Sequence, residues 1–259
     1  MHKQFVNNVI KKIKTNNNVV GLAIGGSWIT NEIDEFSDLD LILISKNKIA
    51  PNVKKMTARA ASFGNLLNAF TGEHVGEKRL LICLYDKPLL HVDIKFLTPD
   101  EFYIRVENPI VVWERNNVLT NIINKSEFNF PYPDFQWIED RFWIWIHYVS
   151  AKIGRGEFLE TLDAINFLRT NVIAQLLQIK NNKLPKGLRK AEMFFSRNDL
   201  ERLKKTIAKY NRNSFIKSLD EIISLYLDLR KELYPKKIIL QTKTEKRSLK
   251  YFEEIKGRI

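Results

Sequence analysis

The sequence predicts an α+β protein in which a mixed-sheet domain is followed by an all-α helical bundle domain. Short apolar runs bounded by glycine, asparagine and proline dominate the first half of the chain, and such runs are typical of strands. Long stretches with apolar residues three and four positions apart dominate the second half and are typical of helices. A proline- and aromatic-rich stretch over residues 125–134 separates the two patterns, and we therefore expect domains at 1–128 and 129–259.

The first domain begins with an amphipathic helix and continues mostly with strands. The turn Asp86-Lys87-Pro88 is short, so the strands on either side of it should form an antiparallel hairpin. Apolar residues at helical spacing predict a second helix over 52–71. The expected elements are a helix over 2–16, strands over about 19–25 and 39–45, the helix over 52–71, strands over 78–85 and 89–97, and a last strand over 110–114.

The second domain is expected to be helical almost throughout. Its first helix, over 135–153, is apolar nearly all round, which indicates burial by neighbouring helices. The polar and basic end of the chain, 236–259, is compatible with a short strand and helix or with a loose tail. The other expected helices span 157–179, 189–195, 198–210 and 213–233.

Composition indicates an ordinary globular protein with a basic second half. The chain has 259 residues, is 44% hydrophobic and has a net charge of +12. Residues 116–259 contain 27 Lys and Arg against 17 Asp and Glu, but these cations are dispersed and match no common RNA-binding module. We therefore expect no nucleic-acid partner. The single cysteine, Cys83, lies in an apolar run and is expected to be a buried, inert thiol.

The start of the chain has no apolar core of the kind found in signal peptides, and no stretch approaches eighteen apolar residues. From these two features we expect a cytoplasmic protein with no membrane partner. Nothing in the sequence marks an interface between subunits, so a monomer and a homodimer both stay open.

The candidate binding and catalytic residues lie at the end of the first predicted strand and at the start of the second. Gly25 and Gly26 end the first strand and can turn backbone N–H groups toward an anion, and Ser27 adds a hydroxyl. Asp38 and Asp40 begin the second strand, and residues two apart in a strand face the same side. Paired carboxylates repel one another unless one is protonated or a divalent cation binds. A phosphate-binding turn ahead of such a pair suggests metal-assisted phosphoryl or nucleotidyl transfer.

This order of residues resembles the signature of the polymerase-β-type nucleotidyltransferase superfamily. The signature has a Gly-Ser pair, a spacer of about ten residues, and Asp-x-Asp flanked by apolar residues. Its third carboxylate, on a later strand, is matched here by Asp93, and His91 shares the face of Asp93. The resemblance implies that Gly25, Gly26 and Ser27 hold the phosphates of ATP or another nucleoside triphosphate, and that Asp38, Asp40 and Asp93 bind Mg²⁺ and are catalytic.

A sheet domain followed by a helical bundle also resembles the aminoglycoside and lincosamide adenylyltransferases of that superfamily. Lys152 and Arg155 are three residues apart on one helical face and are candidates to bind the triphosphate. They also suit the end of a helix, where cations are favoured. Glu157 and Glu160 begin the next helix, and Glu157 is our candidate for a further catalytic residue, as a general base or as a partner of an amino group on the acceptor.

The sequence thus predicts a Mg²⁺-dependent nucleotidyltransferase that moves a nucleoside monophosphate, AMP from ATP, to a hydroxyl of a small molecule. The resemblance suggests an aminoglycoside or lincosamide antibiotic as acceptor, and hence a role in antibiotic resistance. Two alternatives stay open at this level. One is transfer to a protein or an RNA acceptor, and the other is a non-catalytic module that binds a nucleotide or RNA.

Overall fold

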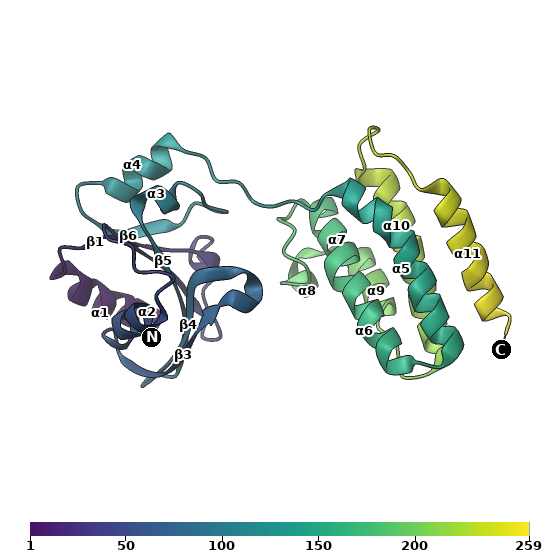
Figure 1. Ribbon diagram of the computed structural model, residues 1–259, viewed down its shortest axis with the longest axis horizontal. Coiled ribbons are helices and arrows are strands. Elements are labelled where there is room, and N and C mark those ends of the chain that lie inside the picture. Colours follow the sequence, from purple (N-terminus) through teal and green to yellow (C-terminus); the bar gives the residue numbers. More distant parts are fainter. Residues whose placement is uncertain (259) are drawn as a thin grey trace. The chain divides into compact units, whose positions relative to one another are not determined.

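The structure, a computed structural model, describes residues 1–258 and divides into two compact units, Met1–Phe130 and Pro131–Ile259 (Figure 1). The first unit contains a mixed sheet with helices, and the second is helical, which confirms the predicted fold class. Each unit has a hydrophobic core of its own. Over the described residues, the structure contains no helix with the length and apolar character needed to cross a membrane.

The sheet of the first unit has six strands in the order β3-β4-β5-β2-β1-β6. The neighbours β2 and β5 are parallel, and the other neighbouring pairs are antiparallel. The predicted hairpin is confirmed by the antiparallel pairing of β4 with β5. The strands are β1 (Val19–Ile24), β2 (Leu39–Ser45), β3 (Asn65–Gly72), β4 (Glu77–Asp86), β5 (Leu90–Leu97) and β6 (Ile110–Glu114).

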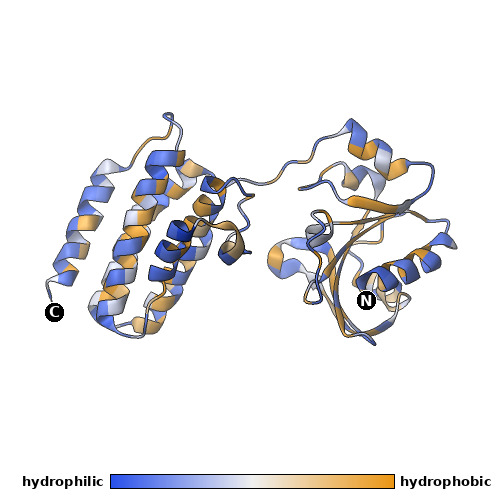
Figure 2. Cartoon of the chain, turned by 180° about the vertical axis from the view of Figure 1, so that it is seen from behind, coloured by the Kyte–Doolittle hydropathy of each residue, from blue (hydrophilic) through white to orange (hydrophobic). Residues whose placement is uncertain are grey.

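Helices cover both faces of this sheet (Figures 1 and 2), and buried apolar residues form a core on each face. The helices α1 (His2–Lys14) and α2 (Val53–Ala61) pack on the larger core, which includes Leu39, Leu41 and Leu43 of β2. Because side chains alternate along a strand, Asp40, Ile42 and Ile44 face the opposite side. There α3 (Pro99–Phe102) and α4 (Val118–Lys125) pack on a smaller core that includes Ile44 and Leu97.

The helix predicted over 52–71 is wrong in its second half. The helix α2 begins as expected, where the side chain of Asn52 accepts a hydrogen bond from the backbone N–H of Lys55, but it ends at Ala61. Residues 65–72 form β3 instead and pair with β4. Leu67 and Phe70, which completed the helical pattern, are about half exposed. Pairing with the edge of β4 satisfies backbone N–H and C=O groups, and this pairing overrides the local helical spacing.

Cys83 is buried in the core between β4 and the helices α1 and α2, as the sequence predicts. Burial raises the pKa of its thiol to about 12. The thiol therefore stays protonated near neutral pH and is a poor nucleophile.

The second unit is a bundle of helices around one apolar core. Its longest members are α5 (Phe135–Arg155), which ends at Gly156 with φ +77°, and α10 (Arg212–Leu233). The predicted helix over 157–179 is continuous, with a π-helical turn at Arg169–Ile173 between its two α-helical parts. The remaining helices are α6 (Phe158–Leu168), α7 (Ala174–Lys180), α8 (Ala191–Phe194), α9 (Arg197–Lys205) and α11 (Thr242–Lys256).

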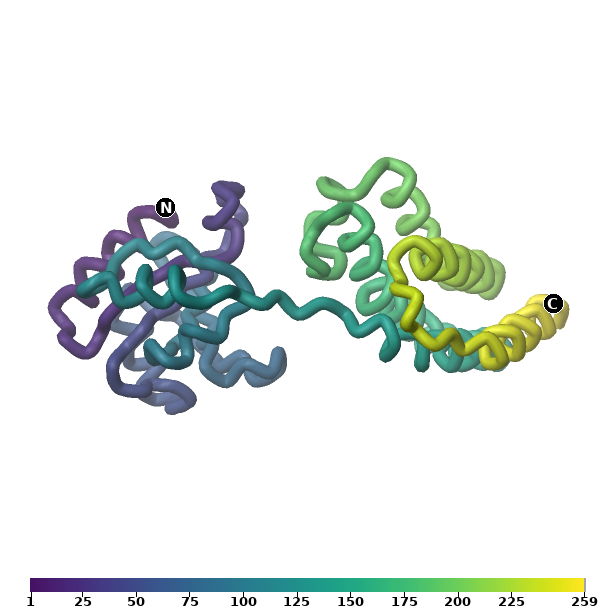
Figure 3. Tube along the Cα trace, turned by 90° about the horizontal axis from the view of Figure 1, so that it is seen from above, coloured from purple at the N-terminus to yellow at the C-terminus, as the bar shows by residue number. Residues whose placement is uncertain are grey.

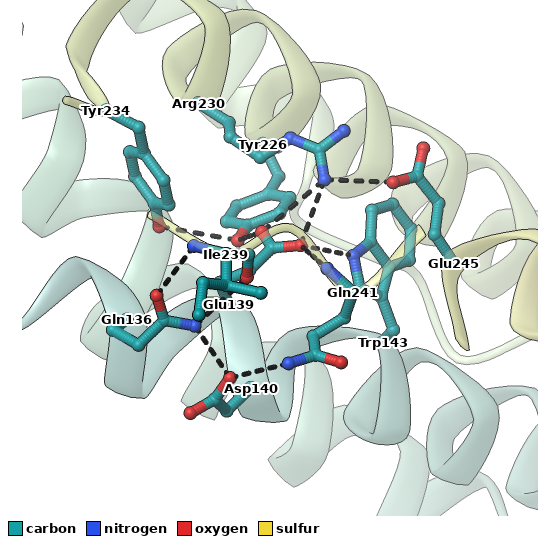
Figure 4. A network of polar contacts seen from close by, with 10 residues as sticks. All are labelled: Gln136, Glu139, Asp140, Trp143, Tyr226, Arg230, Tyr234, Ile239, Gln241 and Glu245. Carbon is teal, nitrogen blue, oxygen red and sulfur yellow. Dashed lines mark hydrogen bonds and ion pairs between the residues drawn. The ribbon is translucent and has the colours of Figure 1, made fainter. Parts of the chain in front are cut away.

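The basic end of the chain, which the sequence left open, forms α11, and this helix runs beside α5 (Figures 1 and 3). The chain that leads into α11 is fixed to α5 by polar contacts (Figure 4). The backbone N–H of Ile239 donates to the side chain of Gln136, and that of Gln241 donates to Glu139. Glu139 is fully buried and also accepts hydrogen bonds from Tyr226 and Arg230 of α10.

Candidate functional site

The glycine turn after β1 lies directly against a carboxylate of β2. The backbone N–H of Gly25 donates to the backbone oxygen of Asp40 at 2.9 Å. Gly26 has φ +61°, and a Cβ at this position would lie 1.9 Å from Oδ2 of Asp40. Only glycine fits here, because any side chain would displace this carboxylate and strain the backbone. Ser27 follows in a short 3₁₀ turn, Gly26–Trp28.

Two of the predicted catalytic carboxylates are neighbours across the parallel strand pair. Asp40 of β2 and Asp93 of β5 are register partners. Adjacent strands are roughly 4.8 Å apart, and residues that are directly opposite in a sheet point to the same face. This is the face that α3 and α4 cover near Ile44 and Leu97, and both carboxylates are partly exposed beyond that cover.

Asp38 lies immediately before β2 and lines a hollow of about 270 Å³. Its lining also includes Ser37 and His91. A ring nitrogen of His91 lies 3.0 Å from Oδ1 of Asp93, so this histidine contacts the predicted site. Asp38, Asp40 and Asp93 thus lie near the N-terminal ends of the parallel strands β2 and β5.

The sequence analysis missed one residue of this site, Glu107. It lies in the segment between α3 and β6, and its Oε1 accepts a hydrogen bond of 2.9 Å from the backbone N–H of Gly26. The two residues are 81 positions apart, and Glu107 lies outside any motif. Only the folded arrangement of this segment reveals the contact.

The donor chemistry of the three aspartates fits Mg²⁺, a hard cation that takes carboxylate oxygens from a protein and leaves positions for substrate phosphates. The close approach of Gly26 to Asp40 puts a backbone that can bind phosphate beside one such carboxylate. Among residues 1–258, however, no three His, Cys, Asp or Glu side chains are gathered tightly enough to form a metal cluster. Mg²⁺ binding by Asp38, Asp40 and Asp93 is therefore a proposal.

The candidate residues of the helical unit form an ion-paired group of their own. Lys152 donates to Oε2 of Glu157, and Arg155 lies 3.5 Å from Oε1 of the same carboxylate. The hydrogen bond from Lys152 lowers the pKa of Glu157, and the pKa of Lys152 is raised by the same contact. Glu160 accepts a hydrogen bond from the hydroxyl of Tyr148. The parts assigned to Lys152, Arg155 and Glu157 in catalysis stay predictions.

No protein-family model matches the sequence, and a search of curated proteins finds no match. Solved structures that are similar include an aminoglycoside 6-adenyltransferase from Bacillus subtilis, with 17% identity, 96% of this chain and 97% of that chain covered, and a TM-score of 0.39. A nucleotidyltransferase-like protein from Exiguobacterium sibiricum has 12% identity, with 96% and 78% covered and a TM-score of 0.35. A spectinomycin adenyltransferase from Enterococcus faecialis, solved with ATP and spectinomycin, has 11% identity, with 98% and 99% covered and a TM-score of 0.32.

Proposed function

We propose that this protein is a nucleotidyltransferase that moves AMP from ATP to a hydroxyl of a small-molecule acceptor. The observation that supports this proposal most is the register of Asp40 with Asp93, together with the glycine turn packed against Asp40. A carboxylate pair beside backbone N–H groups suits a ligand that combines phosphates with a divalent cation. ATP and an aminoglycoside or lincosamide acceptor follow from the resemblance of the sequence signature.

In this reaction the acceptor oxygen attacks the α-phosphorus of ATP, the bond from that phosphorus to the bridging oxygen breaks, and pyrophosphate leaves. Gly26 and Ser27 hold the β- and γ-phosphates through the backbone N–H and the hydroxyl. Asp93 either completes the Mg²⁺ site or takes the proton of the attacking hydroxyl on a carboxylate oxygen, and His91 orients that carboxylate through the 3.0 Å contact. Positioning and charge neutralisation supply most of the rate enhancement in such chemistry.

Asp38, Asp40 and Asp93 would hold Mg²⁺, which neutralises negative charge on the α-phosphate and on the leaving pyrophosphate when it is bound. The register of Asp40 with Asp93 places two like charges side by side, and a bound divalent cation would offset their repulsion.

In the helical unit, Lys152 and Arg155 are our candidates to contact the triphosphate. Glu157 is paired with both, so it would be released when these cations turn to phosphate. The contact with Lys152 lowers the pKa of Glu157 only while that pair is intact, so a released Glu157 is a candidate both for general base and for binding an amino group of the acceptor. Transfer to a protein or to RNA, and a non-catalytic binding module, stay as alternatives.

The test is a transfer assay with purified protein, Mg²⁺ and ATP across a panel of aminoglycosides, lincosamides and RNA, scored by pyrophosphate release. We expect release that requires Mg²⁺ and one class of small-molecule acceptor. Asp38→Asn should abolish release and leave the fold intact, while Asp100→Asn, an exposed aspartate of α3, should leave release unchanged. Pyrophosphate release with RNA as the only active acceptor would favour transfer to RNA. Binding of ATP without release of pyrophosphate would favour a non-catalytic binding module.

A further inference from the structure

The N–H group of Gly26, which the proposed function assigns to a phosphate, already has an anionic partner within the chain. Oε1 of Glu107 accepts its hydrogen bond at 2.9 Å. A Cβ on Gly25 would lie 2.7 Å from the same oxygen, so the carboxylate is in close contact with both glycines of the turn. A carboxylate oxygen and a phosphate oxygen make the same kind of charge-assisted hydrogen bond to a backbone N–H.

The backbone on both sides of Glu107 is anchored. The guanidinium of Arg105 is nearly buried, with 8% of the residue exposed, and donates to Asn108 and to Ser126 at 2.7 Å each. The backbone oxygen of Arg105 accepts a hydrogen bond from Asn129. The segment that carries Glu107 is thus held in place beside the turn. Rotation of the Glu107 side chain, without movement of this backbone, would free the N–H of Gly26.

Two carboxylates therefore border the glycine turn, Glu107 at the N–H of Gly26 and Asp40 at its Cα. Asp40 is suited to binding a cation that accompanies the nucleotide. In the proposed function a phosphate binds this N–H, so Glu107 would compete with the phosphate for the same donor and repel it. We propose that Glu107 is an autoinhibitory residue that closes the glycine turn until the triphosphate of a nucleotide displaces its carboxylate. This inference rests on the proposed function of the turn.

The substitution Glu107→Gln tests the inference, because it removes the charge and keeps the shape of the side chain. A hydrogen bond to a charged acceptor exceeds one to a neutral acceptor by roughly 1.4 kcal/mol, which corresponds to about tenfold in affinity. We expect isothermal titration with Mg²⁺ and ATP, without acceptor, to show an affinity about tenfold higher for Glu107→Gln than for the wild type. Inorganic pyrophosphate should show the same gain, and adenosine should show none.

The matched control is Glu127→Gln, which removes the same charge from an exposed position in the same unit and should leave the affinity within twofold of the wild type. Circular dichroism and thermal unfolding of each variant report on the fold. A wild type that binds ATP, combined with a Glu107→Gln variant that binds it equally or more weakly, would overturn the inference and spare the proposed function. If neither the wild type nor Glu107→Gln binds ATP or pyrophosphate, the inference and the proposed function are both contradicted.

Discussion

Gly26 combines two constraints that the sequence alone does not separate, a left-handed backbone and contact with Asp40. Its φ is +61°, and a Cβ would overlap Oδ2 of Asp40. Gly76 has a similar φ of +77°, but no atom lies within 4 Å of the position of its Cβ. The chain therefore contains a natural control for backbone strain without displacement of a carboxylate.

Gly76→Ala should lower the free energy of unfolding by about 1–2 kcal/mol, the cost of placing a Cβ in a left-handed conformation, and Gly26→Ala should lower it by more, because its Cβ also displaces Oδ2 of Asp40. Only Gly26→Ala should lose binding of ATP, because only there is a carboxylate of the site displaced. Urea unfolding and titration with Mg²⁺ and ATP measure the two effects. Equal ATP affinity for the two variants would contradict the role of the turn.

Glu77 is the residue of the first unit whose titration has a clear consequence for stability. Hydrogen bonds from Arg79, and further contacts with Lys95 at 2.8 Å, lower the pKa of Glu77 from 4.5 to about 2. A pKa that is lower in the folded state gives stability that is complete above the unfolded value of about 4.5 and is lost as the pH falls toward 2.

We expect Glu77→Gln to lower the free energy of unfolding by roughly 1–3 kcal/mol at pH 7. The difference from the wild type should shrink between pH 4.5 and pH 2, because the wild-type carboxyl becomes protonated over that interval. Urea unfolding at a series of pH values gives both curves. A difference that does not change with pH would show that the ion pairs of Glu77 are not its source.

At the scale of elements, the polar contacts of Glu139 join two helices of the second unit, α5 and α10, to the chain that leads into α11 (Figure 4). The carboxylate accepts from the hydroxyl of Tyr226 at 2.6 Å, from Arg230 at 3.2 Å and from the backbone of Gln241 at 2.9 Å. Arg230 also pairs with Glu245 of α11 at 2.9 Å. The contacts of Tyr226, Arg230 and Gln241 thus meet at the buried carboxylate of Glu139, and Arg230 links it to α11.

Glu139→Gln should destabilise the second unit by about 3 kcal/mol, because Arg230 then loses one of its two carboxylate partners inside the bundle. Hydrogen exchange should show the largest loss of protection in α11, which depends on these contacts. The control is Glu192→Gln at an exposed position of α8, which should have a much smaller effect. A variant of Glu139 that keeps full protection in α11 would contradict this account.

The elements also show what local sequence can predict. The alternation around Asp40 and Asp93 marks buried strands, and the structure confirms both. In contrast, residues 65–72 have apolar spacing compatible with a helix, and only the unpaired edge of β4 makes them a strand. The contact of Glu107 with Gly26 likewise depends on where the segment after α3 lies in the fold, which no local pattern encodes.

At the scale of the whole molecule, the residues proposed for nucleotide binding and transfer come from both units. The sheet unit holds the glycine turn and the aspartates, and the helical unit holds Lys152, Arg155 and Glu157. Their basic excess also differs, since most of the net charge of +12 comes from the second half of the chain. Such a surplus attracts polyanions in general, and the proposed nucleoside triphosphate is one of them.

The central claim is that Asp40 and Asp93 act together on a divalent cation that accompanies the nucleotide. The most direct test is the affinity for ATP, by isothermal titration with and without Mg²⁺, of the wild type, Asp40→Asn, Asp93→Asn and the control Asp100→Asn. We predict that Mg²⁺ strengthens ATP binding at least tenfold in the wild type and the control, and that both site variants lose this gain. An equal gain from Mg²⁺ in all four proteins would contradict the claim.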